Sequence, residues 1–109
     1  MTTICCEDDI IFDKNWFSQL MLTIAEIDHK EYMLNLGKES DQSPEKRYAT
    51  HTEPYLCGAQ GIFYPNKPLR NAVAEYAMQN INRGIFDDLI GRYAKQYATL
   101  YNTIPPLVS

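Results

Sequence analysis

The chain has 109 residues and a mass of 12.6 kDa. A chain of this size buries about two-thirds of its surface on folding, which is enough for one hydrophobic core and excludes a multidomain enzyme or a large barrel. Hydrophobic residues make up 45% and charged residues 22%, values typical of a globular domain and not of a disordered chain. We therefore expect residues 1–109 to form one compact domain.

The charge is unevenly distributed. Residues 1–53 carry 11 acidic and 5 basic side chains, whereas residues 54–109 carry 3 acidic and 5 basic ones. A net charge of −4 and a pI near 5.0 disfavour binding to the phosphates of nucleic acid. An acidic half favours either a basic partner or simple solubility.

Neither a membrane span nor a secretory leader is expected. No stretch approaches the roughly 18 apolar residues of a transmembrane candidate, and the first nine residues contain no basic segment. The three cysteines, Cys5, Cys6 and Cys57, are too few and too unevenly placed for a disulfide framework. A reducing, cytoplasmic location fits this cysteine usage.

A helix is predicted near residues 13–28. Its apolar residues recur at steps of three and four and fall within an arc of about 140°. Asp13 and Asn15 are the candidate N-caps, because a short side-chain oxygen can accept a hydrogen bond from an unpaired amide. The apolar arc comprises Trp16, Phe17, Leu20, Met21, Ile24 and Ile27.

Strands are predicted in the middle of the chain. Residues 30–36 and 47–53 alternate with a period of two and flank a polar loop, so we expect them to pair as a hairpin. Residues 60–64 form a possible third strand. Together they predict a small antiparallel sheet.

Two further helices are predicted after the strands. The first covers residues 68–83, with Asn66 as its cap. The second covers residues 86–102 and has the most regular apolar face, with Asp87 and Asp88 favourably placed in its first turn.

These elements predict an α+β fold in which three helices pack against the small sheet. Residues 104–109 contain two prolines and cannot remain helical, so they either fold back on the core or form an apolar tail. We expect one shared core formed by Trp16, Leu20, Ile24, Val73, Tyr76, Leu89, Ile90, Tyr93 and Tyr97.

The sequence contains no arrangement typical of a metal or cofactor site. The CxxC, HxxxH and HExxH spacings are absent, as are the glycines and lysine of a phosphate-binding loop. The cysteines are therefore expected to be small, buried and inert. A catalytic role for Cys57 would require folding to bring His29 or His51 beside it, which leaves a small thiol- or His-dependent enzyme as the alternative function.

A nucleic-acid-associated regulator is a further alternative. The connection at residues 80–85 superficially suggests a helix-turn-helix. Asp87 and Asp88 would then occupy the positions that contact bases, where the phosphates would repel them. DNA binding is therefore disfavoured.

Acidic residues and tyrosines point instead to a protein partner. An acidic run near the N-terminus has no evident internal role, and tyrosines in the strand and loop region are of the type enriched at interfaces. The plainer interpretations are a solvated surface run and the edge of the core. The candidate partner-binding residues are Glu7, Asp8, Asp9, Tyr48, Tyr55 and Tyr64.

The sequence thus favours a small cytoplasmic protein, not an enzyme, that binds and blocks or regulates another protein. Immunity proteins, antitoxins and virally encoded inhibitors have this profile. No cofactor, metal or membrane is expected, and the oligomeric state is left open.

Overall fold

The computed structural model describes residues 2–7, 9–28, 31–37, 47–51, 61–84, 86–104 and 106–109. Three helices and a five-stranded mixed sheet form an α+β fold, as predicted, with a larger sheet than expected. In chain order the elements are β1 (Thr3–Cys6), α1 (Trp16–Glu26), β2 (Tyr32–Asn35), β3 (Tyr48–Thr50), β4 (Gly61–Tyr64), α2 (Lys67–Gln79), a 3₁₀ turn (Ile81–Arg83), α3 (Phe86–Tyr97) and β5 (Thr99–Thr103).

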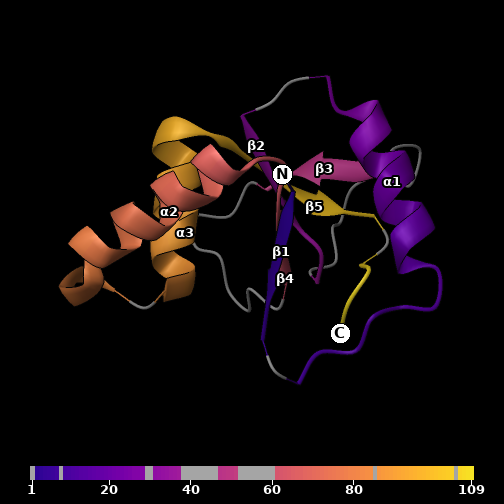
Figure 1. The fold of residues 1–109 in the computed structure, drawn as a ribbon, viewed down its shortest axis with the longest axis horizontal. Helices are drawn as coiled ribbons and strands as arrows, with labels where there is room; N and C mark the ends of the chain where they lie inside the picture. The colour runs from indigo at the N-terminus through magenta and orange to yellow at the C-terminus, as the bar shows by residue number, and fades with distance from the viewer. Residues whose placement is uncertain are drawn as a thin grey trace.

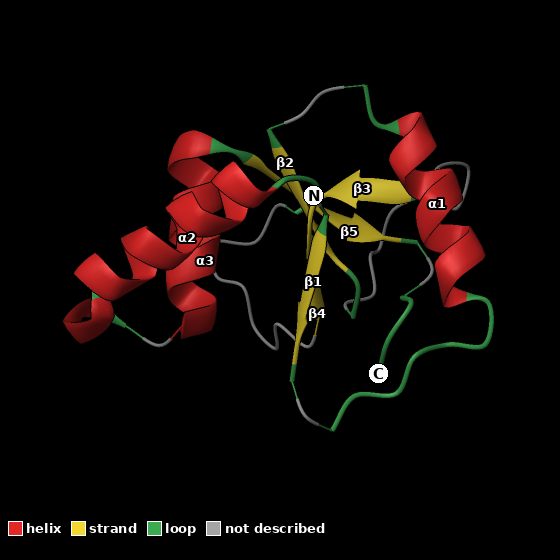
Figure 2. Cartoon of the chain, in the orientation of Figure 1, coloured by secondary structure: helices red, strands yellow, loops and turns green. Residues whose placement is uncertain are grey.

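The strands lie in the order β1-β4-β2-β5-β3. The β2 and β5 strands are parallel, and every other neighbouring pair is antiparallel. The sheet stands between two layers of helix, with α2 and α3 on one face and α1 on the other (Figures 1 and 2). We call these the α2/α3 face and the α1 face.

Every residue of β2 and β4 is buried, because helices cover both faces of the sheet there. This two-sided burial explains why the segments around Met33 and Ile62 are almost continuously apolar. Successive side chains point to opposite faces. Met33 packs on the α2/α3 face and Leu34 on the α1 face.

The core is therefore divided in two by the sheet. On the α2/α3 face, Val73 and Ile90 contribute to the cluster that covers Met33. On the α1 face, Leu20 and Ile27 from α1 cover Leu34. The single core predicted from the sequence mixed residues from both faces.

The C-terminal segment folds back on the α1 face, which settles the alternative left open by its sequence. Leu107 and Val108 are buried there. The Leu107 amide donates to the Leu36 carbonyl over 2.6 Å, and Phe12 forms a β-bridge with Val108. The end of the chain is thus tied both to β2 and to the segment that precedes α1.

The predicted hairpin is wrong. The β2 and β3 strands are not neighbours, because β5 lies between them. The β5 strand occupies residues that the sequence assigned to the end of the third helix, since Leu100 and Tyr101 continue the apolar face of α3. Pairing with the buried β2 strand and with β3 overrides that local pattern.

Other boundaries differ by a few residues. The α2 helix begins where Asn66 accepts a hydrogen bond from the Leu69 amide over 2.9 Å, as expected for a cap. It ends at Gln79, and the Asn80 side chain donates to the Tyr76 carbonyl over 2.8 Å. Tyr97 is exposed at the end of α3 instead of belonging to the core.

We predict that Ile90→Ala lowers the free energy of unfolding by about 2–5 kcal/mol, because it leaves a cavity under α3. Urea unfolding followed by circular dichroism measures this loss. Met78→Ala, at an exposed position on α2, is the matched control and should change stability by less than about 0.5 kcal/mol. A loss below about 1 kcal/mol for Ile90→Ala would contradict the packing of α3.

Candidate functional site

The β1 strand is one edge of the sheet. It pairs with β4 on one side, and no strand in the described part of the chain pairs with its other side. Natural edge strands are commonly protected by a lysine, a proline or a bulge. The sequence of β1 is Thr-Ile-Cys-Cys, which supplies no lysine or proline. Among the described residues, the outer side of this edge is therefore left without a paired strand.

An apolar groove runs beside this edge on the α1 face. It has a volume of about 390 Å³ and lies between β1 and α1, with the Phe63 ring of β4 among its walls. This volume is comparable with that of ligand-binding clefts, which is roughly 300–1,000 Å³. The lining residues are Thr2, Thr3, Ile4, Trp16, Phe17, Leu20, Met21, Ile24 and Phe63.

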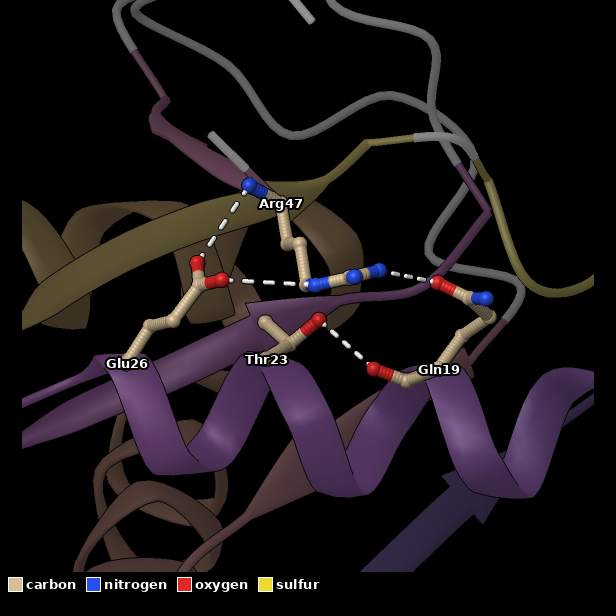
Figure 3. A network of polar contacts seen from close by, with 4 residues as sticks. All are labelled: Gln19, Thr23, Glu26 and Arg47. Atoms are coloured by element: carbon tan, nitrogen blue, oxygen red, sulfur yellow. Dashed lines mark hydrogen bonds and ion pairs between the residues drawn. The ribbon is translucent and has the colours of Figure 1, made fainter. Parts of the chain in front are cut away.

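Polar contacts hold one flank of α1 against β3. Arg47, which precedes β3, forms an ion pair with Glu26 at 3.3 Å and donates a hydrogen bond to the Gln19 side chain (Figure 3). The Thr23 hydroxyl donates to the Gln19 carbonyl over 2.8 Å within the same helix. Residues three, four and seven apart share one side of a helix, so these contacts all fall on a single flank.

The opposite flank of α1 borders the groove and remains largely uncovered. Phe17 is 60% exposed and Met21 is 50% exposed. Together with Ile24 they follow the same three- and four-residue spacing on the side away from Arg47. A helix tied down along one flank thus presents apolar side chains along the other.

Aromatic rings cluster where α1 begins. The ring centroids of Phe12 and Trp16 are 4.6 Å apart, and those of Trp16 and Phe17 are 5.5 Å apart in an edge-to-face arrangement. Trp16 is half-buried, whereas Phe12 and Phe17 are exposed. Partly covered tryptophan and other aromatic side chains are the residues that most often dominate binding energy in interfaces.

The segments that frame the groove are strongly acidic. Residues 2–28 contain six acidic side chains and a single lysine. Glu7, Asp9 and Asp13 are exposed on the connection between β1 and α1, whereas the predicted site residue Asp8 lies outside the described residues. The acidic run that the sequence predicted therefore lies on the connection between β1 and α1, the two elements that line the groove.

Two of the three tyrosines predicted as partner-binding residues lie in the described part of the chain, and they differ in how deeply they are buried. Tyr64 is only 3% exposed and packs in the core of the α2/α3 face, so it offers no surface to a partner, and burial raises its pKa. Tyr48 is half-buried against Tyr101, with ring centroids 4.8 Å apart. Tyr55 lies outside the described residues.

The expectation that the cysteines are buried is wrong for two of them. Cys5 and Cys6 are exposed, because they belong to the edge strand. Cys57 and His29 lie outside the described residues. Within the described ranges, no three or more His, Cys, Asp or Glu side chains are grouped to hold a metal ion.

A row of polar side chains crosses the α2/α3 face. Asn35 on β2 and Asn102 on β5 are partners across the parallel register, and both are buried. The Nδ1 atom of His51 lies 3.3 Å from the Oδ1 atom of Asn102. The buried Nδ2 atom of Asn35 has no hydrogen-bond partner in the described structure. Together with the contacts between Arg47 and α1, this row is the second cluster of polar side chains in the described structure.

A smaller apolar hollow lies on the far side of the molecule. It has a volume of about 250 Å³ between the end of α2 and the start of α3. Met78, which is 73% exposed, and Ile81 form part of its wall. It has no sheet edge in its lining, which distinguishes it from the groove beside β1.

Sequence reasoning missed the groove because it missed β1. Phe17 and Met21 were assigned to the apolar arc of the first helix, and nothing in that arc indicates which side remains uncovered. The available signal was the width of the arc, about 140°, which is more than the 100° or so that a surface helix needs to face a core.

No helix in the described ranges is both long enough and apolar enough to cross a membrane. Comparison of the chain with protein-family models, curated proteins and solved structures found no match.

The reactivity of Cys6 should depend on pH. Its sulfur lies close to Gly61, and partial burial, followed by the nearby Cys5, raises the pKa of the Cys6 thiol. Because only the thiolate reacts, the midpoint of alkylation by iodoacetamide should lie at higher pH in the folded protein than in the protein unfolded in guanidinium. Mass spectrometry of the N-terminal peptide, in a Cys5→Ser background, measures it. An equal or lower midpoint in the folded protein would contradict this assignment.

Proposed function

We propose that this protein acts by binding another protein through the groove beside β1, and that binding blocks or regulates the partner. The single observation that carries this proposal is an apolar groove of about 390 Å³ that borders a sheet edge with no further strand paired to it in the described part of the chain. Contiguous exposed apolar surface of this kind marks interaction sites in soluble proteins. The half-buried Trp16 and the exposed Phe17 supply the aromatic anchors that such sites use.

The partner's binding segment should be apolar and basic. Residues 2–28 carry six acidic side chains against one lysine, and Glu7, Asp9 and Asp13 are exposed on the connection between β1 and α1, the two elements that line the groove. Complementary charge accelerates encounter and selects among partners, while burial of apolar surface supplies most of the affinity. The same acidic surface repels phosphates, which disfavours nucleic acid as the partner.

A second candidate function is a thiol- or His-dependent enzyme that uses Cys57. The observation that favours it is the approach of His51 to the Asn102 side chain, since an amide oxygen beside one ring nitrogen can orient a catalytic imidazole. The two candidates differ in whether Cys57 is needed. Replacing Cys57 by Ser leaves partner binding intact under the first and removes activity under the second.

The groove can be tested by substituting its exposed flank. Phe17→Asp with Met21→Asp should abolish capture of a partner from a lysate of the native cell, because it places charge on the apolar wall. Met78→Asp, on the other apolar hollow, is the control and should leave capture unchanged. The captured protein is then purified, and calorimetry measures its affinity for the native protein, for the Phe17→Asp, Met21→Asp variant and for the Met78→Asp variant. Equal affinity for all three would remove the groove from the proposal.

The acidic residues can be tested by charge reversal. Glu7→Lys with Asp9→Lys should slow association with that purified partner by about tenfold or more at low salt, because it removes electrostatic steering. The matched control is Glu31→Lys with Glu75→Lys, which changes the net charge equally at exposed positions outside the connection between β1 and α1. Stopped-flow measurements at several salt concentrations give the rates. A rate that is insensitive to salt and to both reversals would leave the acidic run as a solubility feature.

A further inference from the structure

We infer that the partner binds as an extended segment that pairs with β1 and becomes a sixth strand of the sheet. This inference rests on the proposed function and adds the conformation and sequence pattern of the segment that is bound. Three features of the described structure support it: the open side of β1, the direction in which its side chains point, and the position of the acidic residues.

The open side of β1 supplies main-chain hydrogen-bonding groups. Among the described residues, Thr3–Cys6 is paired with Gly61–Tyr64 on its inner side and with no strand on its outer side. In an antiparallel edge strand, alternate amides and carbonyls point outward and need a partner or water. An extended peptide satisfies them with its own main chain, which gives affinity without requiring a particular sequence.

The alternation of β1 side chains directs part of an added strand into the groove. Ile4 lies opposite Phe63 on the α1 face, and Cys6 lies over Gly61 on the same face. A strand paired with β1 follows this alternation, so every second side chain would project from the α1 face, on which Phe17 and Met21 line the groove. The groove then selects apolar residues at alternate positions and not at the three- and four-residue spacing of a helix.

The acidic residues lie at one end of this edge. Glu7 follows β1 directly and is exposed, as is Asp9. A lysine or arginine at the end of the bound segment that lies beside Glu7 would meet this charge. The expected ligand is therefore a short extended segment with alternating apolar residues and basic residues at one end.

Charge also decides between a partner and a second copy of this chain. Two β1 strands paired edge to edge would add a second acidic segment at this edge, with a single lysine in residues 2–28 and no basic residue next to Glu7. A second copy therefore matches the charge at this edge less well than a basic segment does. A basic segment of a different protein is the occupant that the surface fits.

The test uses a display library of random twelve-residue peptides selected on the full-length protein. Counter-selection on the Phe17→Asp, Met21→Asp variant removes peptides that bind elsewhere. The expected outcome is enrichment of peptides with apolar residues at every second position and with lysine or arginine at one end. The selected peptide should bind the Glu7→Lys, Asp9→Lys variant at least tenfold more weakly than the native protein.

Main-chain pairing is then tested with N-methylated versions of that peptide. Methylation of one alternating set of amides should weaken binding at least tenfold, while methylation of the other set has little effect, because only one set faces β1. Equal sensitivity or insensitivity of the two sets overturns strand addition.

The other outcomes separate the inference from the proposed function. Enrichment of groove-dependent peptides with helical spacing overturns strand addition and leaves the groove as a protein-binding site. If no groove-dependent peptide is enriched, the inference is overturned. If the native partner binds the Phe17→Asp, Met21→Asp variant as tightly as the native protein, the proposed function is overturned. A dimer seen by analytical ultracentrifugation and abolished by Phe17→Asp with Met21→Asp identifies a second copy as the occupant and overturns the inference.

Discussion

The burial of β2 on both faces is the constraint on which the rest of the structure depends. All four of its residues are buried, so each face of the sheet must be covered by other elements. The α2 and α3 helices together cover one face, but α1 and the C-terminal segment must cover the other. Leu20 and Ile27 anchor α1 over the middle of the sheet, Arg47 contacts its flank toward β3, and the groove lies between its other flank and β1. The groove is the part of the α1 face that the single helix leaves open.

The sequence predicts features that are decided locally. The α1 and α2 helices follow from their periodicity. The Asn66 cap is also local, because its side chain accepts a hydrogen bond from the Leu69 amide only three residues away. The β5 strand could not be predicted in this way, because Leu100 and Tyr101 fit a helix equally well and only pairing with β2 makes them a strand. The four residues of β1 likewise carry no periodic signal of their own and become a strand through β4.

The same distinction applies to the candidate site. The acidic run near Glu7 is visible in the sequence, but its position at the end of an open edge depends on β1 pairing with β4. Phe17 and Met21 belong to a helix that was predicted, yet their exposure depends on where Arg47 ties the other flank. Tyr64 shows the converse, since a residue expected near a surface is enclosed by α2 and α3. Tertiary contacts between distant segments decide which of the suitable residues form a site.

The open edge of β1 is the central claim, and residue-resolved amide hydrogen exchange tests it most directly. In the free protein, the amides of Thr3–Cys6 that point toward β4 should be protected, and the alternating outward amides should exchange rapidly. Addition of a groove-dependent peptide should protect the outward amides as well. Uniform protection of all four amides in the free protein, or outward amides that still exchange rapidly when the peptide is bound, would contradict the account.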